Sequence, residues 1–284
     1  MDVGVGLPNS IPGTPGRLLV DWARRAEALG FSTLATIGRV AYPTYEELIA
    51  LAAAAGATER IGLMTNVLLA PTRDPVLFAK ETASLDQLSG GRLTLGLAAG
   101  GRPDDFTVTG REFADRGKRF DAQLELLRHA WAGEPVAGSP KPVGPRATRD
   151  TGVPVLIGGM SNATLRRIPE CAGWTAGGAS PDMVAPYAKR VREAWTAAGR
   201  SGAPRTCALA YFSLGDTEAA SIAYLDDYYA FSDWGAQLAR GIPRTPDAIR
   251  QLVDAYAAIG VGELVFSPTV ADLAQLDLLA QVVS

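Results

Sequence analysis

Histidine and cysteine are scarce in this sequence, and their scarcity excludes several kinds of active site. His129 is the single histidine among 284 residues. It falls near the end of a helical pattern, where a histidine suits the negative end of the helix dipole. Hydrolases built on histidine metal ligands or on a Ser-His-Asp triad are therefore disfavoured. The two cysteines, Cys171 and Cys207, lack the spacing of a zinc site or a disulfide framework, so we expect buried, reduced thiols.

Long apolar runs and an excess of one charge are also missing. The longest apolar run, 48–56, is far shorter than the roughly 20 residues that cross a bilayer. The first residues lack the basic segment of a signal peptide. Lys and Arg total 27 against 30 Asp and Glu, and the two signs are interspersed, so no basic stripe suits a phosphate backbone. We expect a cytoplasmic protein that binds neither membranes nor nucleic acids.

Short apolar runs alternate with helical patterns along the whole chain. Strands are predicted at 3–8, 33–37, 61–69, 93–99, 153–159, 173–178, 207–214 and 263–267. Helices are predicted at 17–29, 45–57, 75–88, 119–132, from about 161, at 181–198, from 217 to about 259 with a break near 241–246, and at 271–283. The stretch 133–152, rich in Pro and Gly, is predicted to be a surface loop.

Eight such units predict a closed parallel (β/α)8 barrel of the TIM type, as a single domain over residues 1–284. A doubly wound open sheet is the alternative, because its strands are also buried on both faces. In a barrel, ligands bind at the carboxyl ends of the strands. The residues that follow each predicted strand are therefore the candidates for a binding site.

The clearest local motif lies at 157–167. A strand ends at Gly158 and Gly159, and a helix begins at once with Ser161 and Thr164 in its first turn. Glycine allows the backbone to approach a ligand, and a helix start offers unpaired N–H groups to an anion. The two hydroxyls could add hydrogen bonds to a phosphate. The alternative is an ordinary serine N-cap without a ligand.

A second motif follows the fourth predicted strand. Ala99, Gly100 and Gly101 leave room for a flat ligand, and Arg102 could meet its anionic part. The alternative is a glycine-rich turn with a solvated arginine. The next acidic residues, 104 and 105, are adjacent in a predicted loop, so we expect them to be solvated and not to form a glycosidase pair.

Polar residues interrupt or follow other strands. Thr65 and Asn66 interrupt a buried strand, which predicts either a bulge or a ligand contact. Asn9, Arg39, Arg102 and Tyr228 are candidates for a substrate pocket. Tyr228 belongs to a cluster that either packs a helix or forms a lid or apolar substrate wall; its other members are Tyr224, Tyr229, Phe231 and Trp234. No catalytic acid or base can be named, which favours a site whose chemistry is carried by a cofactor.

Several segments together resemble one known family. Asp86-Gln87-Leu88-Ser89-Gly90-Gly91-Arg92-Leu93, leading into Leu95-Gly96, is similar to the DQLSxGRxxLG signature of the luciferase-like flavin-dependent oxidoreductases. The segments 26–31, 70–80, 153–159 and 260–264 fit the same pattern. The resemblance covers essentially the whole chain, and its central signature is specific.

The resemblance implies an eight-stranded barrel with FMN or the deazaflavin coenzyme F-420 across its mouth. It implies that Ser161 and Thr164 bind the phosphate and that Gly100 and Gly101 form a second phosphate wall. It also implies a bulge near Asn66 and Val67, where relatives often carry a cis peptide beneath the ring. Family members are often dimers, so a homodimer is expected.

The sequence departs from the family at three places. Many relatives have a histidine after the second strand, where this chain has 36–40 without one. Deazaflavin-dependent relatives often have a glutamate after the fourth strand, where this chain has Gly101 and Arg102. Bacterial luciferase has an arginine on the fourth strand where this chain has Ala99. These departures leave the proton-transfer groups unassigned and both cofactors open.

Three functions are consistent with these observations. The first is a monooxygenase that oxidises a small organic substrate with reduced FMN, supplied by a separate flavin reductase, and oxygen. The second is a dehydrogenase or reductase that uses the deazaflavin coenzyme. The third is a flavin-binding protein without catalytic activity.

Overall fold

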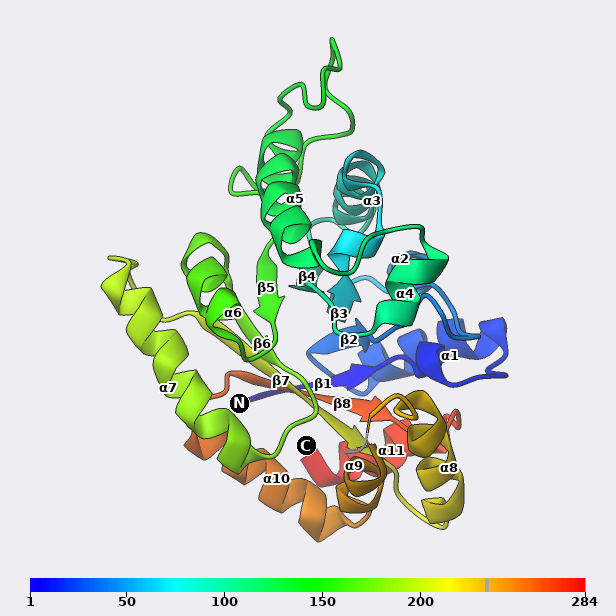
Figure 1. Ribbon diagram of the computed structural model, residues 1–284. Coiled ribbons are helices and arrows are strands. Elements are labelled where there is room, and N and C mark those ends of the chain that lie inside the picture. The colour runs from blue at the N-terminus through cyan, green and yellow to red at the C-terminus, as the bar shows by residue number, and fades with distance from the viewer. Residues whose placement is uncertain (233–234, 284) are drawn as a thin grey trace.

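The computed structural model describes residues 1–232 and 235–283, and in it eight parallel strands close into one barrel (Figure 1). Each strand pairs with its neighbours in chain order, and β8 pairs with β1. The predicted TIM-type barrel is confirmed, and the open-sheet alternative is wrong. The strands are β1 (Asp2–Gly6), β2 (Thr33–Thr36), β3 (Gly62–Leu69), β4 (Leu93–Ala98), β5 (Val155–Gly158), β6 (Gly173–Ala176), β7 (Arg205–Phe212) and β8 (Glu263–Pro268).

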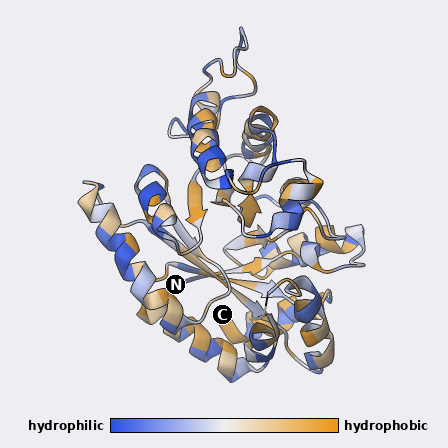
Figure 2. Cartoon of the chain, viewed as in Figure 1, coloured by the Kyte–Doolittle hydropathy of each residue, from blue (hydrophilic) through white to orange (hydrophobic). Residues whose placement is uncertain are grey.

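Helices surround the barrel and carry much of the polar surface, whereas the strands are mainly apolar (Figure 2). No helix in the described part of the chain is both long and apolar enough to cross a membrane. The helices are α1 (Gly16–Ala28), α2 (Glu47–Ala57), α3 (Pro75–Leu88), α4 (Pro103–Val108), α5 (Arg116–Trp131), α6 (Asn162–Arg167), α7 (Pro181–Ala197), α8 (Glu218–Tyr228), α9 (Gly235–Gly241), α10 (Pro246–Ala258) and α11 (Ala274–Val283), with 3-10 turns η1 (Pro8–Ser10), η2 (Ala70–Thr72) and η3 (Ile168–Glu170).

The sequence prediction missed two features of the helical layer. The short helix α4 follows the glycines after β4, with Pro103 at its first position, which suits proline because that N–H has no helical partner. The predicted helix 217–259 has a second break after Tyr228, which separates α8 from α9. The predicted loop 133–152 is confirmed and projects beyond α5 in Figure 1.

Apolar cores lie on both faces of the barrel strands. One lies inside the barrel and consists of Ala35, Met64, Leu156, Cys207 and Val265. The larger core packs the outer faces of the strands against the helices. A fully buried side chain such as Phe78 stabilises the fold by about 1.5 to 3 kcal/mol. The strand ends are therefore held on a rigid frame.

Both cysteines are free thiols. Cys207 is buried, as predicted, whereas Cys171 is only partly buried by surface area. Burial raises the pKa of both thiols above the ordinary value, so they stay protonated at neutral pH. His129 lies in the last turn of α5, as predicted, and contacts Glu134.

The signature at 86–96 has a structural role. Arg92 donates hydrogen bonds to the main-chain carbonyls of four residues, Ala55, Thr58, Ile61 and Ser89. Asp86 accepts hydrogen bonds from the N–H and the hydroxyl of Thr148, both at 2.7 Å. These contacts tie the ends of α2 and α3 and the loop 133–152 to the amino ends of the strands. The signature therefore marks the fold and takes no part in chemistry at the opposite rim.

A polar network closes the amino-terminal end of the barrel. Arg205 donates to Glu263 and to Thr94, each at 2.9 Å, and the Ser32 hydroxyl donates to Glu263 at 2.8 Å. Burial alone would raise the pKa of Glu263, but hydrogen bonds from Thr33, Arg205 and Ser32 hold it below its ordinary value of 4.5. The charged form of Glu263 therefore stabilises the folded state.

We expect Glu263→Gln to lower the free energy of unfolding by about 1 to 3 kcal/mol at pH 7, a range reduced because Arg205 is partly exposed. Since the folded pKa is lowered, this stabilisation is full above pH 4.5 and is lost as pH falls through the folded value. Urea unfolding of both proteins between pH 3 and 7 should show the difference shrinking in acid. Glu193→Gln, in an exposed pair, is the control. A difference that does not vary with pH would contradict this assignment.

Candidate functional site

Every site residue predicted from the sequence lies in an element at the carboxyl ends of the strands. Asn9 is in η1, after β1, and Arg39 follows β2. Asn66 and Val67 are within the last half of β3. The remaining candidates follow β4 (Ala99, Gly100, Gly101 and Arg102), end or follow β5 (Gly158, Gly159, Ser161 and Thr164) or end α8 (Tyr228). The closed barrel thus gathers at one rim residues that are up to 219 positions apart in the sequence, from 9 to 228.

The ends of β4 and β5 form a wall with almost no side chains, which we call the glycine wall: Ala99, Gly100, Gly101, Gly158 and Gly159. A Cβ added to Gly101 would meet no atom within 4 Å, so open space lies beside its backbone. Gly100 and Gly159 have φ angles of +88° and +101°, which side chains rarely adopt. A Cβ on Gly158 would lie 2.8 Å from Val67 Cγ1. Val67 thus covers Gly158, and the open space of the wall lies beside Gly101.

Two hydroxyls stand beside the glycine wall. Ser161 caps α6 by accepting the N–H of Thr164 at 3.1 Å, and the two side-chain oxygens are 3.1 Å apart. Tyr187 donates to the Ser161 carbonyl at 2.8 Å, and Trp174 donates to the Gly159 carbonyl at 2.8 Å. Ser161 is thus an N-cap, as the alternative interpretation predicts, but capping uses only part of the hydrogen-bonding capacity of the two hydroxyls. The rest can serve a ligand.

The polar interruption of β3 is a bulge. The pairing of β3 with β4 shifts register between Thr65 and Leu68, and the Asn66–Val67 peptide bond is cis, as the resemblance implies. The Asn66 side chain accepts a hydrogen bond from Thr175 inside the barrel at 2.7 Å. Its amide is thus satisfied by the protein, and any contact of Asn66 with a ligand would come from the backbone. Val67 lies against the glycine wall.

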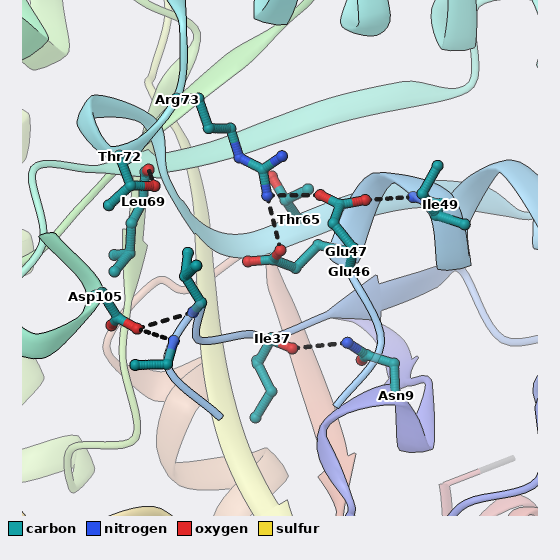
Figure 3. A network of polar contacts seen from close by, with 12 residues as sticks. Asn9, Ile37, Glu46, Glu47, Ile49, Thr65, Leu69, Thr72, Arg73 and Asp105 are labelled. Carbon is teal, nitrogen blue, oxygen red and sulfur yellow. Dashed lines mark hydrogen bonds and ion pairs between the residues drawn. The ribbon is translucent and has the colours of Figure 1, made fainter. Parts of the chain in front are cut away.

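The prediction that Asp105 is solvated is wrong, because its side chain is fully buried. One of its carboxylate oxygens accepts the N–H groups of Val40 and Ala41, both at 2.8 Å (Figure 3). Asp104, also expected to be solvated, remains about half-exposed and pairs with Arg39. Helix α4 therefore fixes both the backbone and an arginine of the loop after β2.

A buried ion pair supports the same loop, and sequence reasoning missed it. Arg73 bridges Glu46 at 2.5 Å and Glu47 at 2.9 Å (Figure 3). Glu47 is 6% exposed, and a Cβ on Gly38 would lie 2.4 Å from its carboxyl carbon. Burial raises the pKa of Glu47, although Arg73 opposes the shift. Nothing in the local pattern of 45–57 distinguishes Glu47 from the solvated first turn of a helix.

An aromatic group covers part of the rim. Tyr224, Tyr228 and Tyr229 are buried in one apolar cluster, whereas Phe231 is 47% exposed. Packing is therefore the role of the three tyrosines in this structure. Trp234, which was predicted to belong to the group, lies outside the described residues.

Two arginines approach these rings. Arg39 donates to the Tyr228 carbonyl at 3.2 Å, and its guanidinium is 5.9 Å from the centre of the Tyr228 ring. The Arg102 guanidinium lies 4.9 Å from the ring centre of Tyr228 and 4.4 Å from that of Phe231. The structure thus brings together three of the four predicted pocket residues. The fourth, Asn9, is fully buried and donates to the Ile37 carbonyl at 2.8 Å, and its side-chain oxygen has no partner.

A cavity of about 770 Å³ lies at the opposite end of the barrel, and we call it the basal cavity. Its charged lining includes Arg92, Arg149, Arg205 and Glu263. Arg92 and Arg149 donate hydrogen bonds to main-chain carbonyls, and Arg205 pairs with Glu263. These charged side chains therefore already have partners within the protein. Among the described residues, no group of three or more His, Cys, Asp and Glu side chains is placed to hold a metal ion.

Comparison with known proteins points to one family. The family model described as "Luciferase-like monooxygenase" matches residues 1–262. An uncharacterized protein of Mycobacterium tuberculosis is 31% identical over 213 residues, which cover 63% of this chain and 72% of that protein. The sequence relationship therefore extends over most of the barrel.

Solved structures show the same fold with two cofactors. The oxygenating constituent of 3,6-diketocamphane monooxygenase from Pseudomonas putida, in complex with FMN, has a TM-score of 0.76 at 17% identity and covers 100% of this chain and 98% of its own. The coenzyme F-420-dependent tetrahydromethanopterin reductase from Methanopyrus kandleri has a TM-score of 0.79 at 18% identity, with coverage of 100% and 99%. At these identities the likeness shows the fold alone.

Proposed function

Because the chain belongs to the luciferase-like monooxygenase family, we propose that it is a flavin-dependent oxidoreductase that oxidises a small organic substrate with reduced FMN and oxygen. The observation that carries this proposal is the glycine wall. Open space beside the Gly101 backbone suits the edge of a flat ring system, and a pair of hydroxyls stands beside the wall. The residues present therefore fit a flavin-type cofactor with a phosphate group.

In this proposal the protein positions the cofactor, and the cofactor supplies the redox chemistry. Ser161 and Thr164 hold the phosphate together with backbone N–H groups, as charge-assisted hydrogen bonds. Val67, Gly100 and Gly101 would line the ring at the ends of β3 and β4. The buried tyrosines of α8 would exclude water from the rim, and the exclusion of water prevents side reactions of reactive species.

The deazaflavin coenzyme is the second candidate. It would use the same wall, since it also combines a flat tricyclic ring with a phosphate, and a solved relative of this fold depends on it. The homodimer, the separate reductase and the cytoplasmic location stay predictions from the sequence.

Anaerobic titration of the purified protein with reduced FMN and with the reduced deazaflavin coenzyme tests the proposal. We expect reduced FMN to bind with a dissociation constant at least tenfold lower, and we expect the complex to consume oxygen when it is exposed to air. Cofactor fluorescence and an oxygen electrode are the measurements. Tight binding of the deazaflavin coenzyme alone would replace the proposal with the second candidate, and binding without turnover of any organic substrate would favour a carrier protein.

A further inference from the structure

Arg102 carries a positive charge that the described protein does not neutralise. No carboxylate of residues 1–232 or 235–283 forms an ion pair with it, and its Nε is buried without a hydrogen-bond partner. Arg39, its neighbour at the rim, instead pairs with Asp104. Burial lowers the pKa of the Arg102 guanidinium, but its contacts with Tyr228 and Tyr229, which include a hydrogen bond to Tyr228, outweigh burial and raise it, so the side chain stays charged at pH 7.

The groups around Arg102 are neutral aromatic rings. Its guanidinium lies 4.9 Å, 5.5 Å and 4.4 Å from the ring centres of Tyr228, Tyr229 and Phe231. Burial raises the pKa of Tyr228 and Tyr229 above the ordinary value of 10, so both phenols keep their protons at pH 7. Cation–π attraction to such rings is worth about 0.5 to 2 kcal/mol each, but it leaves the net charge in place.

The position of Arg102 separates it from the proposed phosphate site. Arg102 follows β4 and reaches the end of α8, whereas Ser161 contacts Tyr187 of α7. Tyr228, Tyr229 and Phe231 contact Arg102, whereas Thr164 and Tyr187 contact Ser161. The side chain of Arg102 is not fully buried, so a ligand can approach it from solvent.

Resting on the proposed function, we infer that Arg102 selects the substrate: an aromatic molecule with a negative charge, such as a carboxylate or phenolate, pairs with its guanidinium while its ring packs against the exposed side of Phe231. The anion supplies the missing counter-ion. Phe231 is 47% exposed and supplies an apolar surface, and aromatic rings prefer edge-to-face or offset contacts with a second ring. Arg102 is thus a specificity-determining residue.

Three probes with the same bicyclic carbon skeleton test this inference on the FMN complex. They are 2-naphthoate, its neutral analogue 2-naphthamide, and the saturated anion decahydro-2-naphthoate. We expect 2-naphthoate to bind at least tenfold more tightly than either of the others, as measured by calorimetry. Equal binding of 2-naphthoate and 2-naphthamide by the wild-type protein would overturn the inference without any variant.

Variants then assign the effect to Arg102. Arg102→Gln should reduce the preference for 2-naphthoate over 2-naphthamide to less than threefold, and Arg102→Lys should retain most of it. Arg200→Gln is the matched control, because Arg200 also stacks on a ring, that of Trp195 at 4.3 Å, far from the rim. A preference that survives in Arg102→Gln would overturn the inference.

The same titrations separate this inference from the proposed function. FMN affinity is measured first for each protein. If FMN binds and the anion preference is missing, the inference fails and the proposed function stands. If Arg102→Gln weakens FMN binding and leaves 2-naphthoate unaffected, the anion that pairs with Arg102 belongs to the cofactor, and the inference is overturned. If FMN does not bind, the proposed function fails.

Discussion

Gly101→Val is expected to weaken FMN binding at least about 100-fold, equivalent to about 2.7 kcal/mol, while the fold keeps its stability. A Cβ at this position meets no protein atom within 4 Å, so a valine does not disturb the barrel. Its φ angle lies outside the left-handed region, so a side chain is tolerated there. The branched side chain would occupy the space that we assign to the cofactor. Fluorescence titration with FMN and thermal unfolding are the measurements.

Gly56→Val is the matched control for this variant. Gly56 lies in α2, and a Cβ there also meets no atom within 4 Å, but the position is remote from the rim. We expect both variants to melt within a few degrees of the wild-type protein and only Gly101→Val to lose FMN. Wild-type affinity in Gly101→Val would show that the cofactor does not contact the end of β4.

The double variant Ser161→Ala, Thr164→Ala is expected to weaken FMN binding by about 2 to 4 kcal/mol, because hydrogen bonds to charged groups contribute about 1.5 to 3 kcal/mol each. The fold itself should lose about 1 kcal/mol, since Ser161 caps α6. Binding is measured by fluorescence titration at low temperature, where the folded state is fully populated.

Two controls separate loss of phosphate contacts from loss of the cap. Thr245→Ala removes the N-cap of α10, whose hydroxyl accepts the N–H of Ala248 at 3.2 Å, and should leave FMN affinity unchanged. Riboflavin lacks the phosphate, so the double variant should bind it as the wild-type protein does. An equal loss of affinity for riboflavin and FMN would place the phosphate elsewhere.

The barrel could be predicted from the sequence because its evidence is repetitive. Buried strands alternate with helices, and some helices carry a clear start signal, as at Asp74, which accepts the N–H groups of Val76 and Leu77 while Pro75 begins α3. The glycine wall was also visible, since paired glycines stand at the ends of β4 and β5. In a closed barrel the carboxyl ends of all strands meet at one rim, so residues that follow different strands can be assigned to one site from the sequence.

The contacts that complete the site could not be predicted, because they join distant segments. Asp105 looks like a solvated loop residue until α4 places it against the N–H groups of Val40 and Ala41. Glu47 resembles any acidic residue in the first turn of a helix, and only its pairing with Arg73 shows why it is buried. Burial of an ionisable group depends on tertiary packing, which periodicity does not encode.

The position of Arg102 shows the same limit. The sequence placed it after β4 as either a solvated side chain or an anion contact. Its ring partners, Tyr228 and Phe231, come from the end of α8, more than 120 positions away. The break after Tyr228 that turns these rings toward the rim has no glycine or proline to mark it in the sequence.

A crystal structure of the protein with FMN tests the central claim most directly. The account predicts electron density for the ring in the open space beside Gly101 and for the phosphate within hydrogen-bond distance of the Ser161 and Thr164 hydroxyls. Density for FMN in the basal cavity would contradict it. So would an ordered rim that holds no FMN in crystals soaked at a saturating FMN concentration.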